Sequence, residues 1–108
     1  MIYFKVELSP ISRFNEWIIS PTDKMAELIC PISGSFSVVF SRILGLSYPD
    51  YLRAVRDLYG GRIVGKYHKY PTVYFQTKEK AIELALLLEK NFSFFMKRER
   101  DNNDRIIS

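Results

Sequence analysis

The sequence contains few of the residues that build catalytic and metal sites. Cys30 is the only cysteine and His68 the only histidine among 108 residues. A single cysteine excludes an internal disulfide and any zinc site made of several thiolates. No apolar run reaches the roughly 18 residues of a membrane span, and Lys5 and Glu7 interrupt the N-terminal segment before a signal-peptide core. These absences predict a soluble cytoplasmic protein without a metal, a cofactor or a membrane partner.

Enzymatic activity is not predicted either. A general base or an activated nucleophile needs a partner side chain, and His68 has no carboxylate or cysteine close to it in sequence. Gly60, Gly61 and Gly65 do not form a phosphate-binding loop, because the predicted helix precedes the glycines instead of following them. The acidic residues show no metal-ligand spacing. The sequence therefore predicts a binding protein that is not an enzyme.

The positive charge is moderate and concentrated in one part of the chain. The net charge is +4 and the isoelectric point is near 9.3, values compatible with binding a DNA or RNA backbone or an acidic protein surface. Residues 53–80 contain only Asp57 and Glu79 as acids, so basic residues outnumber acids by five there. The seven basic residues are Arg53, Arg56, Arg62, Lys66, Lys69, Lys78 and Lys80.

The pattern of apolar residues predicts a small α+β domain over residues 1–96, followed by a charged, frayed tail over residues 97–108. Residues 2–8 alternate between apolar and polar side chains, which is typical of a half-buried strand. Ser9 and Pro10 are typical of a helix start, and the apolar residues after them recur at helical spacing to about Pro21. These residues are Ile11, Phe14, Trp17 and Ile18.

A second short helix is predicted from Thr22 and Asp23, ending before Cys30 and Pro31, because the residue before a proline avoids helical geometry. Its predicted core residues are Met25, Leu28 and Ile29. Cys30 is predicted to be a small buried apolar residue.

Residues 35–44 fit two templates. Phe36, Val38 and Phe40 alternate as in a strand, while the wider pattern also matches a helix. We favour the helix, because Gly45 follows the last periodic residue and glycine there is typical of a helix C-terminus. If the segment is a strand instead, the order of elements fits a ferredoxin-like sandwich, which also suits RNA or protein binding.

A firmer helix is predicted over residues 48–59. Ser47 and Asp50 form a capping pattern, and Pro49 lies in the first turn, where a missing N–H costs nothing. The glycines at 60 and 61 end the helix. Its predicted buried stripe consists of Leu52, Val55, Leu58 and Tyr59.

Period-two patterns then predict a β-hairpin with strands at residues 62–67 and 70–75 and a turn at His68 and Lys69. Pro71 cannot donate to a ladder, so the second strand is predicted to be an edge there. Thr77 caps a last, long helix. One face of it carries Ala81, Leu84, Ala85, Leu88, Phe92 and Phe95. The remaining apolar residues, among them Leu86, Leu87, Phe94 and Met96, predict either burial on two sides or an interface, such as a homodimer.

Part of this pattern resembles the helix-turn-helix of winged-helix DNA-binding proteins. The resemblance covers about twenty residues and is carried by Ser41, Leu44, Gly45, Leu46, Ser47, Ala54 and Val55. In that family a small residue lets the two helices approach, glycine builds the turn, and serine or threonine caps the recognition helix. The basic hairpin that follows stands in the place of the wing. Ser41 replaces the usual alanine, and Tyr51 replaces the usual valine or isoleucine.

The resemblance implies which residues contact nucleic acid. It places Tyr48, Asp50, Arg53, Arg56 and Asp57 on the groove-facing side of the recognition helix. Arg53 and Arg56 would contact phosphates or guanine edges. The other candidate contacts are Arg62, Lys66, His68 and Lys69, on the hairpin.

Other readings remain open from the sequence. Arg53 and Asp57 are spaced as a solvent-exposed ion pair on one helix. Tyr67, Tyr70 and Tyr74 fit ordinary strand positions. The hairpin and the basic, aromatic surface would also suit a small phage-type modulator that binds a host protein or nucleoprotein complex.

Overall fold

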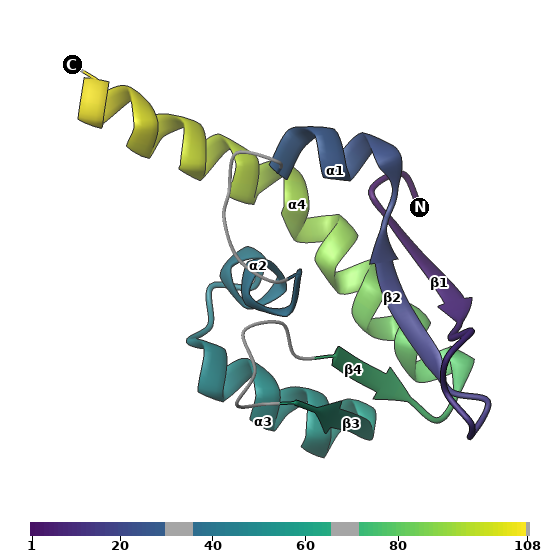
Figure 1. Ribbon diagram of the computed structural model, residues 1–108. Coiled ribbons are helices and arrows are strands. Elements are labelled where there is room, and N and C mark those ends of the chain that lie inside the picture. Colours follow the sequence, from purple (N-terminus) through teal and green to yellow (C-terminus); the bar gives the residue numbers. More distant parts are fainter. Residues whose placement is uncertain (30–35, 66–71, 108) are drawn as a thin grey trace.

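The computed structural model describes residues 1–29, 36–65 and 72–107, with their side chains except those of residues 29 and 99–107. Within these ranges the chain is an α+β domain in which a four-stranded antiparallel sheet is covered by helices (Figure 1). The elements are β1 (Phe4–Leu8), β2 (Trp17–Pro21), α1 (Asp23–Ile29), α2 (Phe36–Ile43), α3 (Tyr48–Tyr59), β3 (Gly61–Val64), β4 (Thr72–Phe75) and α4 (Lys78–Ile107).

The sheet consists of two hairpins that meet at one residue pair. Its strand order is β1-β2-β4-β3. Strands β1 and β2 pair from Phe4 opposite Pro21 to Leu8 opposite Trp17, whereas β2 meets β4 only where Trp17 lies opposite Phe75. Strands β1 and β3 are therefore the edges, and β4 lies between β2 and β3. Pro71, where an edge was predicted, lies outside the described residues.

The helix predicted to start at Ser9 is wrong, because Trp17–Pro21 is strand β2. The connection before it turns sharply: the Ser9 N–H donates to the Glu16 carbonyl at 2.8 Å, and Asn15 has a φ of 52°. The Ser9 hydroxyl accepts from the next amides instead of starting a helix. Ile18 and Ile19, which are β-branched, then pair with β1. This long ladder outweighs the helical spacing of the apolar residues.

Helix α4 crosses one face of the sheet, and α2 and α3 complete the core beside it (Figure 1). The six residues predicted for its core face are all buried, which confirms that prediction. They pack with Phe4, Met25, Val39, Phe40, Ile43, Tyr51, Val55 and Phe75. Met25 confirms the core position predicted for α1, but Leu28 is exposed. The backbone of α4 continues through the charged segment to Ile107.

A single carboxylate joins the start of the chain to α4. Glu89 accepts hydrogen bonds from the N–H groups of Ile2, Tyr3 and Phe4, at distances between 2.6 and 3.2 Å. A carboxylate that accepts several amide N–H groups forms charge-assisted bonds, which are stronger than neutral ones. Glu89 therefore holds β1 in place over the middle of α4.

Candidate functional site

Residues 36–43, whose sequence fitted both a strand and a helix pattern, form helix α2. A short turn joins α2 to α3. Gly45 has a φ of 70° and the N–H of Leu46 donates to the Ser41 carbonyl at 3.0 Å, while the N–H of Gly45 donates to the Arg42 carbonyl at 3.1 Å. These two bonds are those of a Schellman helix end. The Ser47 hydroxyl then accepts from the Asp50 N–H at 3.2 Å and caps α3. The turn therefore has a defined geometry at both ends.

Small and large side chains anchor α3 against α2 and the core. Ser41 is buried, and its hydroxyl donates to the Val38 carbonyl at 2.6 Å, so no bulk separates the helices there. Tyr51, the residue that departs from the winged-helix pattern, is only 2% exposed and packs in the core with Val55. Burial raises the pKa of the Tyr51 hydroxyl, which stays neutral.

The predicted buried stripe of α3 is partly wrong. Val55 is buried and Leu52 and Tyr59 are half-buried, but Leu58 is exposed. The inward face is centred on Tyr48, Val55 and Tyr59, and at about 100° per residue Leu58 lies at the edge of that face, in the last turn. Gly60 ends the helix in the left-handed region, with a φ of 63°.

Arg53 and Arg56 project outward from α3, each beside an acid of the same helix. Arg53 Nη2 lies 3.0 Å from Asp50 Oδ1, and Arg56 Nε lies 2.8 Å from Asp57 Oδ1. The hydrogen bond to Arg56 lowers the pKa of Asp57, and the same bond raises the pKa of Arg56. All four side chains are exposed, so water and salt weaken both pairs. The pairing of Arg53 with Asp57 considered from the sequence is thus replaced by two other pairs.

Tyr48 lies at the margin of this surface. Its ring is half-buried against the core, and its hydroxyl is buried without a hydrogen-bond partner among the described residues. Burial raises the pKa of this hydroxyl. Tyr48 therefore contributes to anchoring α3 as well as to its accessible edge.

Arg62 is held by the β1–β2 connection. Its Nε donates to Glu16 Oε2 at 3.0 Å, its Nη2 donates to Glu16 Oε1, and Ser12 Oγ donates to Glu16 Oε1 at 2.8 Å. The guanidinium also lies 5.5 Å from the Phe14 ring centre and 5.0 Å from that of Tyr74. Residue 16 is 46 positions away from Arg62, and no sequence pattern joins them. Arg62 thus ties two hairpins together.

This cluster predicts how stability depends on pH. The hydrogen bond from Arg62 is the largest effect on Glu16 and lowers its pKa below the ordinary value of 4.5, against the opposing effect of burial. A carboxylate whose pKa is lower in the folded state than in the unfolded state stabilises the fold when the pH is above the unfolded-state pKa. That stabilisation is lost as the pH falls through the folded-state pKa. We expect Arg62→Met to remove it, so that the unfolding free energy falls less between pH 5 and 3 than in the wild type.

Urea unfolding at several pH values measures this difference, and NMR titration of the Glu16 carboxyl reports its pKa directly. Arg13→Met, which removes an exposed arginine from the same connection, should leave the pH dependence unchanged. A Glu16 pKa that is the same with and without Arg62 would contradict the assignment.

The predicted hairpin is confirmed as β3 and β4, which pair from Gly61 opposite Phe75 to Val64 opposite Thr72. Its candidate contact residues Lys66, His68 and Lys69 lie outside the described residues, as do Tyr67 and Tyr70. Cys30 also lies outside them. Strand β3 packs beside α3.

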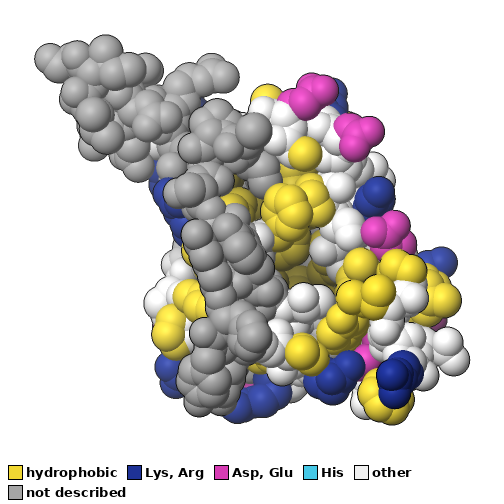
Figure 2. Space-filling model, viewed as in Figure 1, with side chains coloured by type: hydrophobic (Ala, Val, Ile, Leu, Met, Phe, Trp, Pro, Cys, Tyr) yellow, Lys and Arg dark blue, Asp and Glu magenta, His cyan; other side chains and the backbone are white. Residues whose placement is uncertain are grey.

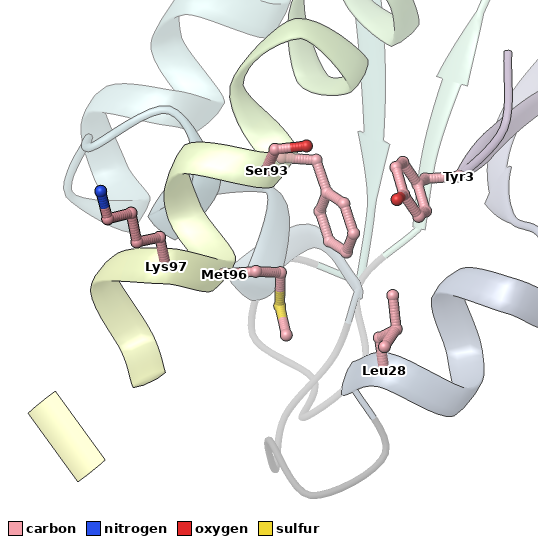
Figure 3. Close-up of a pocket in the computed structure, with 6 residues that line it drawn as sticks. Tyr3, Leu28, Ser93, Met96 and Lys97 are labelled. Carbon is pink, nitrogen blue, oxygen red and sulfur yellow. The ribbon is translucent and has the colours of Figure 1, made fainter. Parts of the chain in front are cut away.

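A hollow on another part of the surface escaped sequence analysis. It has a volume of about 440 Å³ and lies between α1 and α4, lined by Tyr3, Leu28, Phe92, Ser93, Met96 and Lys97. Figure 3 shows Tyr3, Leu28 and Met96 directed into it. The lining comes from three separate segments, so no local sequence motif predicts the hollow. Its described residues bring together no acid–base pair.

The site carries no further chemical signature in the part of the chain that is described. Among the side chains described in residues 1–28, 36–65 and 72–98, no three histidine, cysteine, aspartate or glutamate side chains gather closely enough to hold a metal ion. None of the helices described there has the length and apolar character needed to cross a bilayer. No protein-family model, curated protein or solved structure matches this chain.

Proposed function

We propose that this protein binds duplex DNA through α3 and the β3–β4 hairpin. The observation that carries the proposal is the orientation of α3. Tyr51 and Val55 fix its inner side in the core, which leaves Arg53 and Arg56 on the outer side, and the capped turn holds it against α2. A helix anchored in this way can enter a major groove as a rigid element.

The distribution of charge supports the same surface. Figure 2 shows several lysine and arginine side chains along the lower edge, where α3 and β3 lie in Figure 1, and others at the margins and beside the acidic side chains at the upper right. Lys66 and Lys69 follow β3 in sequence and add two positive charges to the hairpin, and His68 lies between them in sequence. The excess of five basic residues over residues 53–80 attracts a polyanion to this part of the chain.

Asp50 and Asp57 compete with DNA phosphates for the two arginines of α3. In the free protein each arginine of α3 lies beside a carboxylate, and a DNA phosphate must take that place. Exposed ion pairs are weak, so the exchange costs little, while release of condensed counterions from DNA favours it. The acids of α3 therefore tune the affinity instead of preventing binding.

The first test removes the two arginines. For three to five phosphate contacts, the logarithm of affinity should fall with the logarithm of salt concentration at a slope of about −3 to −5. Arg53→Ala with Arg56→Ala should weaken binding about 10- to 100-fold and make the slope shallower by about 2. Fluorescence anisotropy with a labelled duplex across a salt series measures both quantities.

Matched variants separate position from net charge. Lys5→Ala with Arg13→Ala removes two positive charges from exposed positions near β1 and should change affinity much less. Asp57→Asn should strengthen binding several-fold, whereas Glu27→Gln on α1 should not. Equal effects within each pair, salt-independent affinity, or no duplex binding at low salt would refute the proposal.

A second candidate function, binding to a protein partner, is favoured by the β1–β2 connection. Ile11 and Phe14 are 78% and 73% exposed there, and the Arg62–Glu16 cluster holds Phe14 in place. Exposed apolar side chains on a fixed loop are typical of interface anchors. A stoichiometric partner that resists nuclease treatment and is lost with Ile11→Ser and Phe14→Ser would support this function.

A further inference from the structure

Helix α4 has an exposed face opposite its core face. This outer face consists of Glu79, Glu83, Leu86, Leu87, Lys90, Phe94 and Lys97. At about 100° per residue, these positions fall within a sector of about 100°. Leu86, Leu87 and Phe94 are 53%, 39% and 68% exposed, so three large apolar side chains lie in water along about two turns. Exposed apolar side chains grouped on one face of a helix, here with Lys90 between the leucines and Phe94, are typical of an interaction surface.

The charges on the outer face are separated along the helix. Glu79 and Glu83 precede the leucines, and Lys90 and Lys97 follow them. Lys80, at the flank, lies 3.3 Å from Glu83. A parallel copy of α4 would therefore place glutamates beside glutamates and lysines beside lysines. An antiparallel copy places the acidic end of each helix beside the basic end of the other, so the face is complementary to itself.

We propose that a second copy of this chain binds the outer face, with the two α4 helices antiparallel. A two-fold axis between Leu86 and Leu87 places Glu83 of one copy opposite Lys90 of the other on both sides, because the two residues are equidistant from that axis. The leucines of the two copies then meet at the centre. The two helices then face each other from Glu79 to Phe94, about 23 Å of helix.

The geometry of the domain leaves this face available. Ala81, Leu84, Ala85, Leu88, Phe92 and Phe95 take up the opposite side of α4, so a second copy can dock without disturbing the core. Arg98 lies 5.9 Å from the Phe94 ring centre and donates to the Arg42 carbonyl at 2.8 Å, so Arg98 is fixed beside α2 while the Phe94 ring stays exposed. The contact leaves α3 outside the interface, so it is independent of the proposed DNA binding.

The first experiment measures the monomer–dimer equilibrium of the purified full chain by sedimentation equilibrium. We expect a dimer at high micromolar concentration. Phe94→Ser should raise the dimer dissociation constant at least 10-fold, whereas Leu58→Ser, which replaces a similarly exposed apolar residue of α3, should leave it unchanged. A wild-type protein that stays monomeric, or equal effects of the two variants, would overturn the proposal.

A charge exchange tests the antiparallel arrangement itself. Glu83→Lys alone and Lys90→Glu alone should each raise the dissociation constant at least 10-fold, because each places like charges across the axis. An equimolar mixture should form a heterodimer, since every residue at 83 then faces an opposite charge at 90 of the other subunit. Both positions are exposed or half-exposed surface sites, and circular dichroism verifies folding. Variants that fail to recover association when mixed would overturn the arrangement.

Discussion

Replacing Phe92 with alanine should remove about 3–5 kcal/mol from the free energy of unfolding. Phe92 is 1% exposed, and its ring centre lies 4.4 Å from that of Tyr3 and 5.8 Å from that of Phe4. Truncation leaves a cavity at the contact between α4 and β1, which the surrounding rings cannot fill. Because a domain of this size is stable by only about 5–15 kcal/mol, the loss is a large part of the total. Urea unfolding followed by circular dichroism measures it.

Phe94→Ala is the matched control, since it removes the same atoms from the same helix two residues away. Its ring is 68% exposed. At concentrations where the protein is monomeric, this change should cost less than about 0.5 kcal/mol. Losses of similar size for the two variants would mean that the packing assigned to α4 is rotated.

The second large effect is expected at Gly61, where an added methyl group has no room. A Cβ there would overlap Val55 Cγ1 and lie 3.2 Å from Val73 Cγ1 and 3.3 Å from the Val55 carbonyl oxygen. Val55 is buried and β-branched, so it cannot move aside easily. We expect Gly61→Ala to cost about 1–3 kcal/mol by overpacking, measured by the same urea unfolding.

Gly60 is the control position, because alanine is opposed there by the backbone conformation and not by steric overlap. A Cβ on Gly60 would meet nothing within 4 Å, but its φ of 63° is unfavourable for alanine. Gly60→Ala should cost about 1 kcal/mol, whatever residue stands at 55. In a Val55→Ala background, by contrast, the cost of Gly61→Ala should shrink, because the overlapping methyl group is gone. An undiminished cost in that background would show that the steric explanation is incorrect.

Elements with local signals were predictable from the sequence. The cap at Ser47, Pro49 in the first turn and the glycine after Tyr59 all act within a few residues, so α3 has the predicted bounds. The core face of α4 follows from its helical period alone. The helix predicted from Ser9 to about Pro21 was wrong, because the pairing of β2 with β1 outweighs the helical spacing of the apolar residues. The periodicity of one segment does not report its pairing with another.

The candidate site was predictable only in part, for a similar reason. The outward positions of Arg53 and Arg56 follow from the period of α3, and the structure has both exposed. Their partners, Asp50 and Asp57, depend on side-chain conformations that spacing does not determine. The role of Arg62 could not be predicted, since Glu16 comes within hydrogen-bond distance of it only when two hairpins that are distant in sequence pack together.

The hydrogen bonds from the N–H groups of Ile2, Tyr3 and Phe4 to Glu89 have a consequence for synthesis of the protein. Strand β1 is made more than 80 residues before its carboxylate partner Glu89, and also before the aromatic residues that cover it, among them Phe92 and Phe95. Contacts between distant segments form late, because the loop between them must close first. We therefore expect the apolar face of the hairpin of β1 and β2 to stay uncovered until α4 has been made, so that the domain folds as a unit only then.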